Sequence, residues 1–341
     1  MRSARRTGAF LLVAAALALL LAALAWPSLK AWWAPPAPPK EEISIALSNT
    51  YPGSGLLYIA AAKGFFAQEN LDVTLQPYTT GQDAMKAMLD KRADLGTTGD
   101  TPLMFAVMAG QPVAVVATIF TAGGAFGTVA RRDQGVETIA DLKTKRIGVT
   151  RGTDGDFILS TMLARSKISP DDVKLVPLAP EVMVDTLATG TVDAVASWEP
   201  WLTRAQKSLG ENGVEFRIDS GFVLNFSLAG NPEWIRDHPD KVQRLLRALL
   251  RAKTFADEKR SEAQAIVVNA EHIDPTTFNT AGTRYRFVVQ LSESLLILQE
   301  DMARWAIQNK LTAQTTVPNF LNIVDTTALM AVSPDAVTIV R

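Results

Sequence analysis

The sequence predicts an α/β protein of two lobes, each built on a mainly parallel sheet flanked by helices. One observation is that residues 56–117 repeat a helical pattern followed by a short apolar strand three times. A second is that each of these strands ends in small polar residues, such as Gly99-Asp100-Thr101. Alternating helices and strands are typical of a sheet covered on both faces. Ligands of such sheets bind beyond the carboxyl ends of the strands, so we expect function at these polar ends.

The order of the predicted elements suggests that a second sheet begins after Gly124. A first strand at 43–47 and the three repeats supply the first sheet, with helices at 56–68, 82–90 and 101–109 and strands at 71–75, 94–98 and 113–117. The second sheet takes strands at 126–131, 146–149, 173–176 and 193–196 and helices at 139–142, 156–167 and 180–188. A strand at 222–228 then carries the chain back to the first lobe.

The carboxyl-terminal third is predicted to be helical. Residues 239–257 form a long amphipathic pattern with leucines and a valine on one face, and further helices are expected at 262–269 and 292–309. Such a tail packs against a sheet that already exists. We therefore expect lobe 1 to comprise residues 42–128 and 227–341, and lobe 2 to comprise residues 129–226.

Composition narrows the function classes. The 341-residue chain has 34 basic and 35 acidic residues, so no basic field attracts nucleic acid. It has no cysteine, which excludes disulfides, thiolate metal sites and cysteine nucleophiles. Its two histidines, His238 and His272, are far apart in sequence and lack metal-ligand spacing. We expect neither a metal, nor a cofactor, nor an enzyme.

Residues 1–41 are predicted to target the chain to a membrane. Three arginines precede an apolar run from Ala9 to Trp26, and a proline-rich, extended spacer follows at 34–39. The run is either a signal peptide, cut after Ala25, or an uncleaved anchor with tryptophans at the membrane interface. In both cases the folded part lies in the periplasm, either soluble or held at the inner membrane.

Several short motifs follow one another along the chain, and their order and spacing identify a protein family more specifically than any single motif does. They include residues 57–66, 69–73, 94–102, 139–149, 169–173 and 190–201, the last ending in Trp198-Glu199-Pro200-Trp201. In these stretches, which span roughly residues 43 to 310, the chain resembles the solute-binding proteins of bacterial ABC transporters, in the nitrate, sulfonate, taurine and thiamine-precursor group. The resemblance implies a periplasmic-binding-protein type 2 fold, with two lobes joined by two crossing strands and closing on a small ligand. It also implies a monomer that works with an inner-membrane permease and its ATPase.

Ligand groups of the first lobe are expected in the loops at its strand ends. The candidates are Asn49, Thr50, Tyr51, Gln82, Asp100 and Thr101. Tyr51 either stacks on the ligand or covers the first helix. Asp100 either lines the cleft or caps the helix that follows it. Gln82 is either a ligand contact or a solvated residue of a first helical turn.

The candidates in the second lobe and on the return strand are Thr153, Asp154, Trp198, Glu199 and Asn225. Thr153 precedes a helix, where backbone N–H groups favour an anion. Asp154 departs from the resembled family, whose members usually carry small or neutral polar residues there. It either opposes an anion or simply complements the helix dipole. Asn225 either reaches the ligand or is only a ladder residue.

A taurine-like ligand would suit both the helix start at Thr153, which favours an anion, and the acidic residues near the cleft. Its anionic end would lie at Thr153 and its ammonium at Glu199. Trp198 then forms a lid over the ligand, or it packs in the core near the hinge. We accordingly expect the solute-binding component of an ABC importer, which captures a small sulfonate-like or taurine-like solute. The alternatives are a tethered periplasmic sensor, or an enzyme similar to the thiamine-pyrimidine synthases, which the absence of cysteine disfavours.

Overall fold

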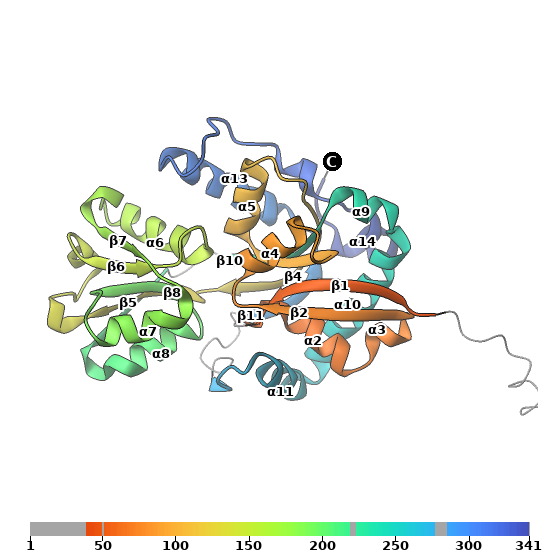
Figure 1. The fold of residues 1–341 in the computed structure, drawn as a ribbon, viewed down its shortest axis with the longest axis horizontal. Coiled ribbons are helices and arrows are strands. Elements are labelled where there is room, and N and C mark those ends of the chain that lie inside the picture. The colour runs from red at the N-terminus through yellow and green to blue at the C-terminus, as the bar shows by residue number, and fades with distance from the viewer. Residues whose placement is uncertain (1–38, 50, 219–222, 277–284, 341) are drawn as a thin grey trace, which may run out of the picture. The chain divides into compact units, whose positions relative to one another are not determined.

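The structure is a computed structural model, and it describes residues 39–49, 51–218, 223–276 and 285–340 (Figure 1). The described residues from Glu41 onward form one compact unit. The apolar run and the proline-rich spacer predicted between residues 9 and 39 lie, except for Pro39, outside the described residues. Within the described ranges, no helix is both long and apolar enough to cross a bilayer.

A six-stranded sheet forms the larger part of this unit. Its strand order is β11-β4-β10-β3-β1-β2, with β1 (Glu41–Ser48), β2 (Leu71–Tyr78), β3 (Leu95–Gly99), β4 (Ala114–Gly123), β10 (Val223–Gly230) and β11 (Tyr285–Gln290). β1 pairs in parallel with β2 and β3. β10 lies antiparallel between β3 and β4, and β11 adds an antiparallel edge to β4. The return strand is therefore confirmed, whereas β11 was not predicted.

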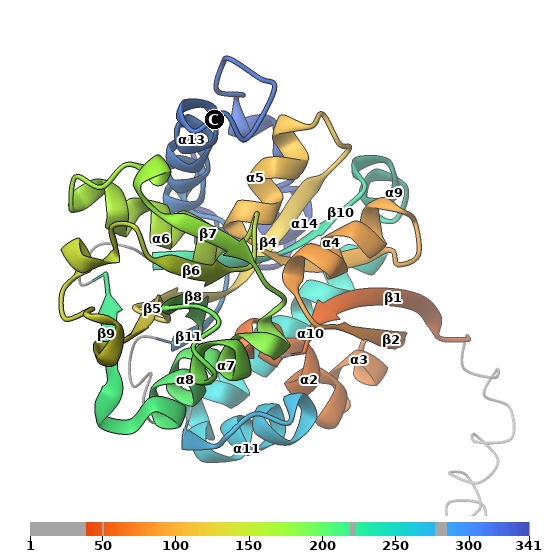
Figure 2. The same ribbon diagram turned by 60° about the vertical axis from the view of Figure 1, so that its left-hand side comes forward.

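Helices cover both faces of the six-stranded sheet. They are α2 (Gly55–Ala62), α3 (Phe65–Gln68), α4 (Gly81–Leu89), α5 (Asp100–Met108), α9 (Pro232–Asp237), α10 (Pro239–Glu258), α11 (Arg260–Glu271), α13 (Glu293–Gln308) and α14 (Thr327–Val332). In Figures 1 and 2, α4 and α5 lie on one face and α2, α3 and α10 on the other. The helix predicted at 56–68 is split, because Gly64 adopts a left-handed φ of 68° between α2 and α3.

A five-stranded sheet forms the second part. Its order is β7-β6-β8-β5-β9, with β5 (Phe126–Arg131), β6 (Arg146–Val149), β7 (Lys174–Pro177), β8 (Ala194–Trp198) and β9 (Gly213–Arg217), and its helices are α6 (Asp154–Arg165), α7 (Pro180–Ala188) and α8 (Trp201–Leu209). Ala194 and Ala196 pack in one cluster with Leu159 of α6, whereas Val195 packs in another with Met183 of α7. Because side chains alternate along a strand, this sheet is covered on both faces.

Short 3-10 turns connect the other elements. They are η1 (Pro52–Ser54), η2 (Arg132–Gln134), η3 (Ile139–Leu142), η4 (Pro170–Asp172), η5 (Gly210–Asn212), η7 (Phe320–Ile323) and η8 (Pro334–Ala336). The helix predicted at 139–142 is thus a 3-10 turn.

The chain crosses between the two sheets twice. It passes from β4 to β5 through Gly124, whose φ of 63° favours glycine, and it returns from β9 to β10. The prediction of an α/β fold with two lobes joined by two crossing strands is confirmed. The exact lobe boundaries, at residues 128/129 and 226/227, stay a prediction.

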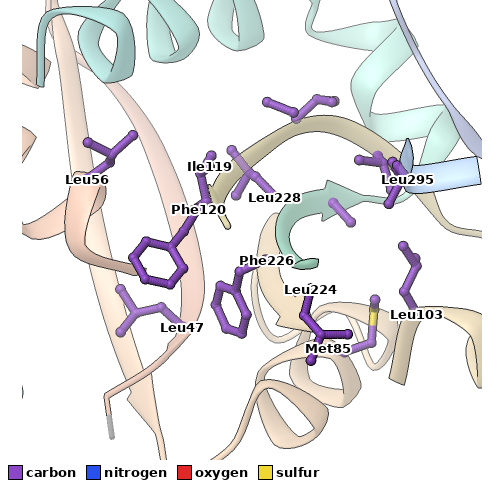
Figure 3. Packing of buried hydrophobic residues seen from close by; sticks show 14 of the residues in the cluster. Leu47, Leu56, Met85, Leu103, Ile119, Phe120, Leu224, Phe226, Leu228 and Leu295 are labelled. Carbon is purple, nitrogen blue, oxygen red and sulfur yellow. The ribbon is translucent and has the colours of Figure 1, made fainter. Parts of the chain in front are cut away.

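An aromatic cluster anchors the core at the inner end of the six-stranded sheet. Phe120 of β4 is buried, and its ring centroid lies 5.6 Å from Tyr51, 5.3 Å from Tyr285 and 5.5 Å from Phe287. Figure 3 shows Phe120 packed among side chains of other elements, including Leu47 and Phe226. This cluster lies directly behind the strand ends where ligand groups are expected.

Replacing Phe120 with alanine should reduce the free energy of unfolding by about 3–5 kcal/mol, because a buried ring is lost and a cavity remains. Ile297→Ala is the matched control, since the Ile297 side chain is 60% exposed on α13 and should change stability by less than about 0.5 kcal/mol. Urea denaturation of both variants measures the difference. Equal losses in the two variants would contradict this assignment of the core.

Candidate functional site

A small cavity lies between the two sheets at the ends of their strands. Its volume is about 40 Å³. The residues that line it come from both lobes: Ser48, Tyr51, Thr80, Gly81, Gln82, Gly99, Pro102 and Phe226 from the six-stranded sheet and its helices, and Phe126, Thr153, Asp154 and Trp198 from the five-stranded sheet and its helices. It therefore lies where the strand pattern predicts a ligand, and it combines aromatic walls with hydroxyl, amide and carboxyl groups.

Asp154 makes the main polar contact across this cavity. It is the first residue of α6, and its Oδ1 accepts a hydrogen bond from the backbone N–H of Thr101 at 2.7 Å. Thr101 is the second residue of α5, so the carboxylate of one lobe lies on the helix N-terminus of the other. The approach is close, because a β-carbon at Gly99 would lie only 2.1 Å from Oδ2 of Asp154. Glycine at position 99 makes this contact possible.

Aromatic contacts accompany the Asp154 contact. The ring of Phe157, one turn further along α6, lies 5.2 Å from Trp305 of α13 in an edge-to-face arrangement. Phe105 of α5 lies 6.1 Å from the same Trp305 ring. The first turn of α6 is thus held against both α5 and α13.

Asp100 lies below this contact and is buried, with 1% of its surface exposed. Its carboxylate accepts hydrogen bonds from the backbone N–H of Asn225 at 2.5 Å and from Nε2 of Gln299 at 3.1 Å. The Asn225 amide nitrogen lies 3.3 Å from both Asp100 oxygens. Asp100 does not cap α5, because Gly99 is the N-cap residue. Its side chain instead connects α5 to β10 and α13.

The two carboxyl groups share one buried, weakly compensated environment. Burial raises the pKa of Asp154 to about 6, although hydrogen bonds from Thr101 and from the Asp100 backbone partly offset the rise. Burial, followed by the charge of Asp154, raises the pKa of Asp100 well above its usual range. Within the described residues, ion pairs form at the nearby Asp156 and Glu199, whereas neither Asp154 nor Asp100 has one.

Glu199 contrasts with Asp154 because a cation compensates it. Its carboxylate is 1% exposed, forms an ion pair with Arg217 of β9 and accepts the N–H of Thr203 at 3.1 Å. Arg217 also donates to the carbonyl of Gly124 at 2.6 Å and pairs with Glu215. Glu199 does not line the cavity. The carboxylate that was expected to accept a ligand ammonium therefore already has a protein partner beside the hinge.

The aromatic walls of the cavity come from both crossings and both lobes. The ring of Tyr51 lies 6.0 Å from Phe126 and 5.7 Å from Phe226. Trp198 lies 6.4 Å from Phe126 and also lines the cavity. Tyr51 is buried, and burial raises the pKa of its hydroxyl well above the usual range. Tyr51 thus packs in the core and faces the cavity at once.

The structure brings together some of the predicted site residues and separates others. Five of them line the cavity: Tyr51, Gln82, Thr153, Asp154 and Trp198. Three form the contacts beneath or beside it: Asp100, Thr101 and Asn225. Asn49 lines a different hollow with Tyr78 and Arg92, and Thr50 lies outside the described residues. That any of these residues contacts a ligand stays a prediction.

Sequence reasoning did not identify several residues of the site. Phe126 and Phe226 were read only as strand residues, although both lie where the chain crosses between lobes. Ser48 is the last residue of β1, and Thr80 is the N-cap residue of α4. These positions at a strand end and a helix start could have marked both residues as candidates. No sequence pattern marked Arg217 as a partner of Glu199, because its strand β9 was not predicted.

A larger hollow of about 430 Å³ lies elsewhere, between α10, α11 and β11. It includes Tyr285 and Arg286, which border residues 277–284, outside the described part, so we assign no site there. No group of three His, Cys, Asp or Glu residues that could hold a metal occurs in the described ranges.

Two α/β lobes with a polar cavity between their strand ends define a two-lobed ligand-binding fold. A family model described as NMT1/THI5 like matches residues 52–263. The chain belongs to this family. A provisionally named binding protein of Brucella abortus (strain 2308) is 24% identical over 76% of this chain and 83% of its own length. A provisionally named aliphatic-sulfonates-binding protein of Bacillus subtilis (strain 168) is 25% identical over 64% and 67%, respectively.

Solved structures share the fold at low sequence identity. The alkanesulfonate-binding protein SsuA of Xanthomonas axonopodis pv. citri, bound to MOPS, superimposes with a TM-score of 0.72 at 20% identity, over 85% of this chain and all of its own. The periplasmic nitrate-binding protein NrtA of Synechocystis PCC 6803 superimposes with a TM-score of 0.70 at 14% identity, over 88% of this chain and 90% of its own. The desulfurization enzyme DSZB superimposes with a TM-score of 0.64 at 18% identity, over 87% of this chain and 99% of its own. The periplasmic-binding-protein fold predicted for this chain is thereby confirmed.

Replacing Arg217 with methionine should destabilise the protein by about 3–5 kcal/mol, because Glu199 would remain buried without a cation. The double variant Arg217→Met/Glu199→Gln should recover part of this loss. Lys86→Met is the control, since the Lys86–Asp90 pair is exposed and should contribute about 0–1 kcal/mol. Urea denaturation distinguishes the three variants. A loss in Arg217→Met no larger than that in Lys86→Met would contradict the assignment.

The raised pKa of Asp154 predicts that stability falls as the pH rises. An unfolded aspartate has a pKa near 3.9, whereas Asp154 in the folded chain has a pKa of about 6, so the folded chain binds the proton more tightly. Its contribution is complete below about pH 4 and is lost as the pH rises through about 6, a change of at most about 3 kcal/mol. Asp100 acts in the same direction.

Denaturation of the full-length protein between pH 4.5 and pH 7 measures this slope. Asp154→Asn should flatten it. Asp90→Asn removes the same charge from an exposed site, where hydrogen bonding to Lys86 lowers the pKa, and should not flatten it. A wild-type slope that is unchanged in Asp154→Asn would contradict the prediction.

Proposed function

We propose that this chain is the extracytoplasmic solute-binding component of an ABC importer. It captures a small organic solute between its lobes and delivers it to an inner-membrane permease that is driven by its ATPase. The observation that carries this proposal is the polar cavity, which both lobes line at their strand ends. Membership of the NMT1/THI5-like family and the names of its relatives, which include binding proteins for sulfonates and nitrate, support it.

We infer that the ligand is a sulfonate-like or taurine-like solute that carries a hydrogen-bond-donating group as well as an anionic one. The hydroxyls of Ser48, Thr80 and Thr153 line the cavity, but they donate to Thr79, Asp83 and Thr150. The anionic end is therefore assigned to backbone N–H groups at the start of α6, which follows Thr153. The carboxylate that faces the cavity is Asp154, whereas Glu199 is paired with Arg217. The ammonium is therefore assigned to Asp154 in place of Glu199.

Binding requires the lobes to separate. A cavity of about 40 Å³ holds little more than one water molecule, whereas ligand sites usually enclose roughly 300–1,000 Å³. The contacts that opening would break are the hydrogen bond from Thr101 to Asp154 and the ring contact between Phe157 and Trp305. Rotation about the two crossings, one of them at Gly124, is the hinge motion typical of such proteins.

The proposed protein works in the periplasm as a monomer, either soluble or held by its amino-terminal segment. We propose binding rather than catalysis, although the desulfurization enzyme DSZB shares the fold. The absence of cysteine from the whole sequence supports this choice, since it removes the thiol nucleophile that such a site could otherwise use.

A thermal-shift screen of the full-length protein tests the proposal. The panel comprises amino-sulfonates, alkanesulfonates, oxyanions and pyrimidines. We expect taurine or another amino-sulfonate to raise the midpoint of unfolding, because a ligand at 100 times its Kd stabilises the folded state by about 2.7 kcal/mol. A panel in which no compound raises the midpoint would count against solute binding of this class.

Gln82→Ala then tests the location of the site. Gln82 lines the cavity from the first turn of α4, and loss of one hydrogen bond should weaken binding about tenfold. Gln111→Ala is the control, because Gln111 is exposed and lies outside the cavity. Calorimetric titration of the best compound gives both affinities. An equal affinity for the two variants would place the site elsewhere.

A further inference from the structure

The N-terminus of α5 provides the setting that an anion usually occupies in proteins. Backbone N–H groups at Asp100 and Thr101 are not used by the helix itself, and the helix dipole adds a partial positive charge. Gly99 carries no side chain of its own that would block the approach to these groups. Sulfate, phosphate and carboxylate groups bind at such helix ends.

In this chain a protein carboxylate occupies that position. Asp154 reaches across from α6 and accepts the N–H of Thr101 at 2.7 Å, with further hydrogen bonding from the Asp100 backbone. It is only 8% exposed and lines the cavity between the lobes. An anionic ligand group at the same point would have to displace Asp154 and would also approach the buried carboxyl of Asp100.

A second carboxylate in the same helical turn behaves differently. Asp156 accepts the N–H of Gly152 at 3.0 Å and pairs with Arg151 at 3.0 Å, so it is satisfied within its own lobe. It does not line the cavity. Both acids belong to the first turn of α6, but only the Asp154 carboxylate contacts α5.

We propose that Asp154 sets the charge selectivity of the cleft, because its carboxylate takes the place of a ligand anion at the N-terminus of α5. The cleft then accepts solutes that present a cationic or N–H donor group toward α5, and it rejects simple oxyanions and sulfonates without such a group. This inference rests on the proposed solute-binding function and specifies the ligand group that faces Asp154.

Calorimetric titration with two matched ligands tests the inference. Taurine and ethanesulfonate share a two-carbon sulfonate and differ in the amino group. Full-length wild-type protein should bind taurine at least about tenfold more tightly than ethanesulfonate. Asp154→Ala should weaken taurine about tenfold and strengthen ethanesulfonate about tenfold, because the helix end becomes free for an anion. Asp154→Asn should increase the affinity for ethanesulfonate less than Asp154→Ala does, since the new amide oxygen can still accept the N–H of Thr101.

Asp156→Asn is the charge-matched control and should leave the ratio of the two Kd values unchanged. Far-UV circular dichroism confirms that each variant is folded, and Asp154→Asn supplies a folded variant if Asp154→Ala is not. An unchanged ratio in the Asp154 variants, or an equal change in Asp156→Asn, would overturn the inference. If wild-type protein binds neither ligand but Asp154→Ala gains ethanesulfonate, the inference stands and the proposed taurine-like solute is wrong.

Discussion

The contact between Asp154 and the N-terminus of α5 is the interaction on which the arrangement of the cleft depends. It brings a second carboxyl group close to Asp100, and the described residues place no cation in an ion pair with either. Hydrogen-bond donors compensate instead, with Asn225 coming from β10 and Gln299 from α13. The polar contacts beneath the cavity thus come from four distant segments of the chain: α5, α6, β10 and α13.

An ion pair distinguishes Glu199 from Asp154. Arg217 neutralises Glu199 and also holds the carbonyl of Gly124, so this group ties β8 and β9 to a crossing between the lobes. Asp154 accepts hydrogen bonds from Thr101 and from the Asp100 backbone and has no ion pair among the described residues, which is why we propose it as the partner of a cationic ligand group. A buried acid that is paired with a cation holds the fold together, whereas a buried acid with a raised pKa that lines a cavity is a candidate ligand contact.

Strand-end reasoning selected five residues that line the cavity between the lobes, and physical causes explain why other selected residues do not line it. Tyr51, Gln82, Thr153, Asp154 and Trp198 all face one cavity because the carboxyl ends of parallel strands meet at one edge. The same rule cannot say which way a side chain points, so it included Asn49, which faces another hollow. It also expected Glu199 to accept a ligand ammonium, and it could not foresee the ion pair of Glu199 with Arg217, because β9 was not predicted.

Other features depend on tertiary packing that no local pattern encodes. Gln299 reads as one more polar residue in a helix, and only the packing of α13 on α5 brings it to Asp100. β9 and β11 are short strands, and their pairing partners lie more than 80 residues earlier in the chain. The alternation of helices and strands, by contrast, is local. The sequence predicts its order from residue 43 to residue 198, apart from the 3-10 turn at 139–142 and the break between α2 and α3.

The position of β10 has a consequence for the order in which the protein can be completed. β10 (Val223–Gly230) is inserted between β3 and β4, so these two earlier strands cannot pair with each other. A ribosome has made more than 220 residues before the larger sheet can close. Strand pairing across such a long sequence separation is slow, because the intervening chain loses conformational entropy before the stabilising contacts form. The larger lobe therefore cannot become compact before about two-thirds of the chain is available, however early its first strands are made.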